Sequence, residues 1–179
     1  MKRHLLRLAL VCTAMVLAGP LGSEPAPAPA APSLDDIPDA MPFNTPYGAP
    51  ISLQRAQAAI KAATDEAERR GWQVSVAVLD SGANLVGLVR MDGANIASIS
   101  IAQKKARTAV EFRRPTKAFE DGIQKKGYNY LLSIDPILAS RGGIPLIEDG
   151  KVIGAIGCSG ATGSQDEAVC TAGAATINK

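Results

Sequence analysis

Basic side chains gather between residues 104 and 117, where Glu111 is the one acidic residue. An arginine can bind a carboxylate through two parallel hydrogen bonds, so this cluster could hold a small carboxylate or the acidic groups of a larger ligand. A solvated helix face, balanced by acids elsewhere, explains the same composition without a ligand. Within the cluster, Arg113 and Arg114 are candidate ligand-binding residues. The basic residues are Lys104, Lys105, Arg107, Arg113, Arg114 and Lys117.

A further arginine lies at the end of a predicted strand. Arg90 is followed by Met91 and then by Asp92, where an Asp-Gly pair ends the strand. At a strand end, Arg90 and Met91 could both reach a ligand. An ion pair of Arg90 with Asp92 or Asp80 is the structural alternative.

Two glycine-containing stretches could approach a ligand closely. Gly142, Gly143 and Pro145 could present backbone amides to an anion or let a flat ligand lie against the main chain, or they could simply form a tight entry into a strand. The loop at 159–163 precedes a helix whose residues 164–167 (Ser-Gln-Asp-Glu) predict a capping box. That loop could hold an anion at a helix N-terminus, but it lacks the lysine of a nucleotide-binding P-loop.

Catalytic residues are not predicted. The single histidine is His4, so the domain that follows cannot form a Ser-His or Cys-His pair. Five candidate carboxylates stand at turns or caps, where acids are expected for structural reasons: Asp80, Asp92, Asp135, Glu148 and Asp166. Cys158 and Cys170 are either a disulfide or two buried thiols, and without histidine they do not make an ordinary zinc site.

Hydrophobic periodicity places these candidates on two hairpins flanked by helices. The strands alternate apolar and small residues, and an Asp-Gly pair at 149–150 is typical of a tight hairpin turn. Such an order predicts an α+β fold with helices on at least one face of an antiparallel sheet. The predicted helices are 52–70, 95–112, 116–124, a short one within 127–140 and 164–177, and the strands are 72–79, 85–91, 144–147 and 152–159.

The N-terminal part of the chain differs from the rest. Residues 1–18 have the basic start, short apolar run and small-residue end of a signal peptide, which predicts an exported protein, periplasmic or secreted and free of the membrane after cleavage. A retained N-terminal anchor is the alternative. Residues 19–50 hold nine of the 12 prolines and predict a disordered linker, leaving 51–179 as one domain. Removing the signal leaves 16 basic and 17 acidic residues, so the charge gives no support for nucleic acid as a partner.

Seven short motifs occur together and in a fixed order across this domain. As a set they resemble the GlcG/HbpS family of haem-binding-type domains, also found as the C-terminal module of PduO-type corrinoid adenosyltransferases. The resemblance covers nearly all of residues 51–177. The motifs are VAVLDSG at 76–82, RMDGA at 90–94, KARTA at 105–109, PT at 115–116, GGIP at 142–145, GAIG at 154–157, and SG at 159–160 with QDE at 165–167.

The resemblance implies a profilin-like domain with a five-stranded antiparallel sheet, and homo-oligomers. It implies haem as a cofactor or ligand, with a role in haem sequestration, redox sensing or haem degradation. The GlcG branch implies instead an accessory protein or enzyme that acts on a small carboxylate in glycolate-type metabolism.

The same resemblance implies a haem pocket near Thr116. A threonine is associated with haem binding in exported relatives, and Thr116 is the matching position for a weak iron ligand. Capping of the helix after Pro115 is its structural alternative. Without histidine, the other iron ligands open to the domain are Met41, Met91, Tyr47, Tyr128, Tyr130, Cys158 and Cys170.

Overall fold

The computed structural model describes residue 41 and residues 43–178. The predicted signal peptide at 1–18 and most of the predicted linker at 19–50 lie outside the described residues. No helix within the described part is both long enough and apolar enough to cross a membrane.

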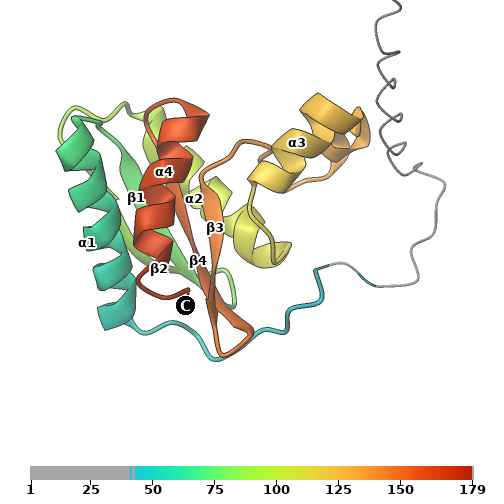
Figure 1. The fold of residues 1–179 in the computed structure, drawn as a ribbon, viewed down its shortest axis with the longest axis horizontal. Coiled ribbons are helices and arrows are strands. Elements are labelled where there is room, and N and C mark those ends of the chain that lie inside the picture. Colours follow the sequence, from blue (N-terminus) through green and yellow to red (C-terminus); the bar gives the residue numbers. More distant parts are fainter. Residues whose placement is uncertain (1–40, 42, 179) are drawn as a thin grey trace, which may run out of the picture. The chain divides into compact units, whose positions relative to one another are not determined.

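Four antiparallel strands form the sheet, in the order β2-β1-β4-β3 (Figure 1). The two predicted hairpins are confirmed as β1–β2 and β3–β4, and pairing of β1 with β4 joins them. The expected five strands are wrong for the described residues, where the remaining sheet-like pairing is a single parallel bridge between Tyr47 and Val152. The strands are β1 (Ser75–Asp80), β2 (Leu85–Arg90), β3 (Gly143–Glu148) and β4 (Lys151–Ser159).

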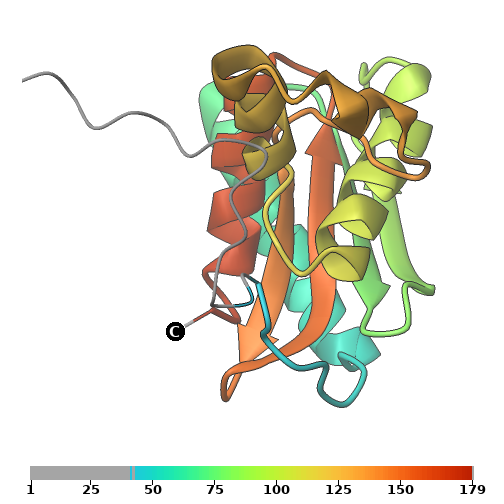
Figure 2. The same ribbon diagram turned by 90° about the vertical axis from the view of Figure 1, so that its right-hand side faces the viewer.

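Helices cover both faces of the sheet, which confirms the α+β fold class. In Figures 1 and 2, α1 and α4 lie on one face and α2 on the other. Because side chains alternate along a strand, Val76 and Val78 of β1 pack in the cluster that contains α1 and α4 residues, whereas Ala77 and Leu79 pack against α2. The helices are α1 (Leu53–Arg70), α2 (Ala97–Glu111), α3 (Lys117–Lys126) and α4 (Gly163–Ala174), with a short 3-10 helix, η1 (Asn129–Ser133), after α3.

Strand β4 is central and buried from Val152 to Ser159, as its apolar and small residues on both faces predict. Its glycines allow other backbone segments to pack closely against it. A Cβ on Gly157 would lie 2.1 Å from the carbonyl oxygen of Ala102 in α2. Helix α2 therefore packs directly on the main chain of β4.

Helix ends and turns follow local sequence signals with one correction. Ser52 caps α1, and Gly71 ends it in the left-handed conformation. The capping box of α4 is formed by Thr162 and Gln165, not by residues 164–167, so the helix begins earlier than predicted. The predicted box has the wrong register because Thr162 also carries a hydroxyl three residues before a Gln.

The segment Phe43–Gly48, which we call the strap, belongs to the fold although it falls within the predicted linker. Strand β1 ends at Asp80 opposite Gly154, which leaves the start of β4 without a neighbour on that side. The strap fills this place: the amide of Gly48 donates to the carbonyl of Val152, and the amide of Val152 donates to the carbonyl of Pro46, both at 2.8 Å. The folded domain thus includes residues before 51.

Candidate functional site

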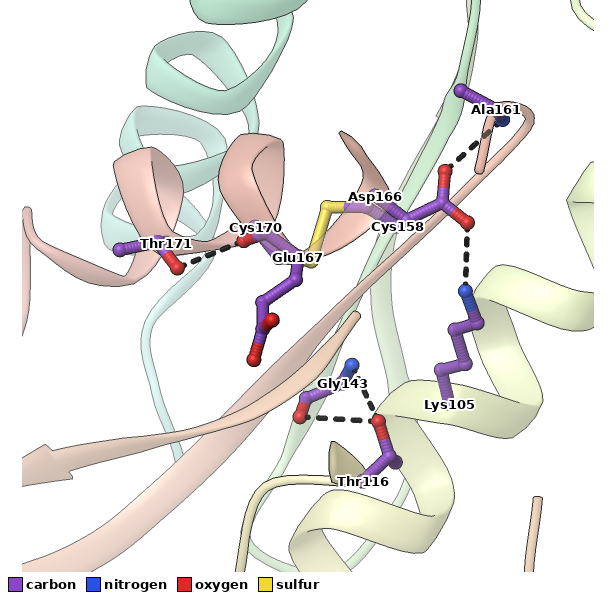
Figure 3. The surroundings of a disulfide bond; sticks show 9 residues. All are labelled: Lys105, Thr116, Gly143, Cys158, Ala161, Asp166, Glu167, Cys170 and Thr171. Carbon is purple, nitrogen blue, oxygen red and sulfur yellow. Dashed lines mark hydrogen bonds and ion pairs between the residues drawn. A yellow bond between two sulfur atoms is a disulfide. The ribbon is translucent and has the colours of Figure 1, made fainter. Parts of the chain in front are cut away.

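Thr116 and Gly143 join the start of α3 to the start of β3 (Figure 3). The Gly143 amide donates to the Thr116 hydroxyl at 2.9 Å, and the Thr116 side chain is fully buried. A Cβ on Gly143 would lie 2.3 Å from the Lys105 carbonyl oxygen. The glycine pair therefore makes a tight entry into β3, and the Thr116 hydroxyl holds that entry without capping α3 through a side-chain hydrogen bond.

This arrangement gives a testable prediction for Thr116. Replacing Thr116 with valine keeps the shape of the side chain but leaves the buried Gly143 amide without a partner, which is expected to lower the free energy of unfolding by about 1–3 kcal/mol. Thermal and urea unfolding of Thr116→Val and of Thr116→Ser measure the effect. The serine variant retains the hydroxyl and should lose less. Equal losses in both variants would show that the hydrogen bond contributes little.

Beside this junction lies a buried ion pair that the sequence analysis did not single out. The Lys105 ammonium group donates to a carboxylate oxygen of Asp166 at 2.8 Å, and the two residues are 1% and 3% exposed (Figure 3). The other Asp166 oxygen accepts from the Ala161 amide at 3.1 Å. Burial raises the pKa of the Asp166 carboxyl, while the hydrogen bond and charge of Lys105 oppose that rise.

The two cysteines form a disulfide between β4 and α4, which decides between the two alternatives. The Cys158–Cys170 S–S distance is 2.19 Å, and both residues are fully buried. Neither sulfur is free to bind a metal in this state.

Arg141 forms a second charged cluster that was not predicted. It pairs with Glu120 at 2.8 Å and Glu167 at 3.5 Å, and so connects α3 to α4. The signal for this cluster is weak in sequence, since the three residues come from three separate segments.

Arg113 and Arg114 contact the strap. The Arg113 guanidinium donates to the Thr45 carbonyl at 3.1 Å and lies over the Tyr47 ring at 5.6 Å. Arg114 lies over the Phe43 ring at 3.9 Å. Burial lowers the pKa of Arg114. The basic cluster therefore does not face a common open site, because the strap contacts two of its members, Arg113 and Arg114.

Arg90 and Met91 lie away from the other predicted site residues. They stand at the end of β2, one edge of the sheet, whereas Gly143 and Pro145 belong to β3 at the opposite edge. Arg90 is exposed, and Met91 packs against the main core cluster. Within the described part of the chain, the strand order therefore separates Arg90 from the β3 residues.

An apolar groove follows the exposed side of β3 next to the Thr116 junction. It has a volume of about 390 Å³, within the range of small-molecule sites of roughly 300–1,000 Å³. Pro115 and Ile144 form one wall, α4 forms the other, and Glu167 brings a charge to it. We call it the β3–α4 groove; its lining residues are Pro115, Ile144, Glu167, Thr171, Ala174, Ala175 and Asn178. A second groove of about 450 Å³ lies between α1 and β2.

The described lining of the β3–α4 groove offers apolar contact to a ligand but no side chain for an iron atom. The described residues contain no histidine, and the two cysteines are joined to each other. The Thr116 hydroxyl is buried and bonded to Gly143, and the Tyr47 hydroxyl donates to carbonyls of α2. Among the described residues, no side chain that commonly binds haem iron lines the groove.

Residues 51–175 match the family described as haem degrading protein HbpS-like. The chain belongs to the HbpS-like family. The match covers nearly all of the described domain, from the residue before the N-cap of α1 to the end of α4. The resemblance drawn from the seven motifs is thereby confirmed.

Relatives of this HbpS-like domain include proteins with and without a named ligand. Protein GlcG of Escherichia coli is 42% identical over 110 residues, 61% of this chain and 81% of GlcG. The corrinoid adenosyltransferase PduO of Salmonella typhimurium is 31% identical over 66% of this chain, but the match spans 36% of PduO. The activity of the whole PduO enzyme is therefore not carried over by this likeness.

Solved structures share the fold of the HbpS-like domain. The crystal structure of HbpS has a TM-score of 0.68 and 33% identity, and covers 78% of this chain and 99% of HbpS. The crystal structure of a PduOC–heme complex has a TM-score of 0.66 and 28% identity, over 72% of this chain and 96% of that one. Members of the family thus include proteins that bind heme.

Proposed function

We propose that this HbpS-like domain binds haem or a related tetrapyrrole, with the flat body of the ligand in the β3–α4 groove. The observation that carries the proposal is that Pro115 and Ile144, both within family motifs, form a wall of an apolar groove. The heme complex of a 28% identical relative supports the class of ligand. Binding then depends on apolar contact with the macrocycle, with Thr116 as a positioning residue behind the wall.

A hemin titration of the purified chain tests this proposal. We expect a saturable shift of the Soret band with micromolar protein. Two matched variants locate the site, because each places an indole on an exposed helix position beside one groove: Thr171→Trp at the β3–α4 groove and Gln57→Trp at the α1–β2 groove.

The two variants separate the possible results. Thr171→Trp is expected to weaken hemin binding by at least about tenfold by filling the groove, whereas Gln57→Trp should leave it unchanged. The reverse order would place the ligand at the α1–β2 groove. A wild-type chain that shows no saturable shift would contradict the proposed function.

The proposed role is binding without catalysis. Asp166 and Glu120 are held in ion pairs and Asp80 in a turn, and among the described residues the groove lining contains a single carboxylate, Glu167, so it lacks an acid–base pair of carboxylates. The family description names haem degradation, and the Soret band of the hemin-loaded chain, followed over time, tests for it. A Soret band that is stable for hours in the presence of a reductant and oxygen supports binding, and a band that decays faster than free hemin would support degradation.

We also propose that the protein is exported and forms homo-oligomers. The Cys158–Cys170 disulfide supports export, since disulfides persist in oxidising compartments. Exposed apolar residues on the edge strand β2, Leu85, Leu88 and Val89, support assembly through that edge. Mass spectrometry of the N-terminus, with a cut expected near Ala18, and light scattering of the purified protein test the two proposals.

A further inference from the structure

The strap is held to the end of α2 by side-chain contacts as well as by its backbone. The Tyr47 hydroxyl lies 2.9 Å from the carbonyl oxygens of both Val110 and Glu111, so it can donate to either of these two groups at the end of α2. The Val110 carbonyl also accepts from the Arg113 amide at 3.3 Å, and the Ala109 carbonyl accepts from the Arg114 amide at 3.2 Å, which are the two backbone bonds of a Schellman helix end. The strap thus adds a side-chain donor to a helix end that backbone hydrogen bonds already close.

Two arginines hold the strap through its aromatic rings. Arg114 lies between Phe43, at 3.9 Å, and Phe119, at 5.1 Å, while Arg113 lies over Tyr47. An aromatic ring over a guanidinium group is a favourable contact, and a planar aromatic anion would make the same contact with an ion pair added. The two uncharged rings of the strap therefore occupy the position over the guanidinium groups that a planar aromatic anion would take.

The position and exposure of the strap allow it to leave. Arg113 and Arg114 directly precede Pro115, which lines the β3–α4 groove. Phe43 is 42% exposed and Tyr47 is 46% exposed, so both residues are in contact with solvent. Arg113 has a left-handed backbone with φ of 54° because it is the residue that closes the end of α2, where the chain turns toward the groove.

We propose that the strap is an intramolecular competitor that occupies the Arg113–Arg114 pair until a planar aromatic anion displaces it. The inference rests on the proposed function, because it takes the anionic edge of the tetrapyrrole in the groove as the group that reaches the arginines. Displacement frees two guanidinium groups for the acidic side chains of the ligand. The strap must then be released before the ligand can bind the two arginines. The strength of the contacts between strap and arginines therefore sets the apparent affinity of the chain for the ligand.

Hemin affinity of strap variants tests the proposal. Phe43→Ala/Tyr47→Ala removes both rings and keeps the strap backbone, and it is expected to tighten hemin binding by about tenfold, the loss of two competing ring contacts. Asn44→Ala, within the strap at an exposed position between the two aromatic residues, is the matched control and should bind like the wild type. Arg114→Ala in the double-variant background should reverse the gain.

Hydrogen–deuterium exchange on the wild-type chain gives a second measurement that needs no variant. Hemin is expected to speed exchange of the Gly48 and Val152 amides, which are bonded between strap and β4. Unchanged or weaker hemin binding by the double variant, or slower exchange of these amides, would overturn the strap as a competitor while hemin binding itself stands. Absence of hemin binding in the wild type and in the double variant would overturn both proposals.

Discussion

Replacing Lys105 with methionine is expected to lower the free energy of unfolding by about 3–5 kcal/mol, the cost of removing one partner from a buried ion pair. The Lys105 ammonium lies 2.8 Å from Asp166, and almost no surface of either residue reaches water. Methionine fills most of the space of the lysine stem, so the loss reports on the uncompensated carboxylate and not on a cavity. Urea unfolding at pH 7 measures it.

The pH dependence of the Lys105→Met variant distinguishes this cause from loss of packing. Burial already raises the pKa of Asp166 in the wild type, and without the lysine nothing of comparable strength opposes that rise. When the pKa of a carboxyl is higher in the folded protein than in the unfolded chain, the folded state loses stability as the pH rises between these two values. The reason is that the unfolded chain releases this proton first. The variant should therefore be closest to wild type near pH 4 and progressively weaker toward pH 7.

A paired replacement completes the test. Lys105→Met/Asp166→Leu removes both charges and is expected to recover to within about 1 kcal/mol of the wild type, since a buried ion pair is often replaceable by apolar residues. The remaining deficit would reflect the Ala161 amide, which loses its acceptor. A Lys105→Met variant within 1 kcal/mol of wild type at pH 7 would show that water reaches the pair and that it does not act as a buried contact.

The hairpins, the order of helices and the central place of β4 were predictable because they depend on local patterns. The Asp149–Gly150 turn takes positive φ at both residues, as that dipeptide favours between apolar runs. Small and apolar residues on both faces of β4 indicate a covered strand, and helices lie on both of its faces. The disulfide was only one of two alternatives, because geometry between a strand and a helix does not follow from spacing.

The site was less predictable because its members are joined by tertiary contacts. Lys105 stands in a run of basic residues that resembles a solvated face, and only the fold reveals that it alone is buried against Asp166. Arg90 belongs to the same set of motifs as Gly143, yet strand order separates them to opposite edges. The strap carries one proline and directly follows a proline-rich segment, and its pairing depends on where β1 ends.

Replacing Gly157 with alanine is expected to lower the free energy of unfolding by about 3 kcal/mol, the upper end of the usual cost of overpacking. The added methyl group would lie 2.1 Å from the carbonyl oxygen of Ala102 and 2.6 Å from the amide nitrogen of Ala106. Both are backbone atoms in the middle of α2, so no side-chain rotation can relieve the clash. Helix α2 would have to move away from β4, and this movement would also displace Lys105 from Asp166.

A second glycine separates this steric effect from the general cost of a Cβ. Gly127 has a φ of 70° at the end of α3 and nothing within 4 Å of a Cβ placed there, so Gly127→Ala should cost about 1 kcal/mol through backbone conformation alone. Thermal unfolding of the two variants side by side compares the effects. Since hemin binding is proposed at β3 and α4, Gly157→Ala should also disturb it through the shared sheet, whereas Gly127→Ala should not. Equal destabilisation by the two replacements would contradict direct packing of α2 on the main chain of β4.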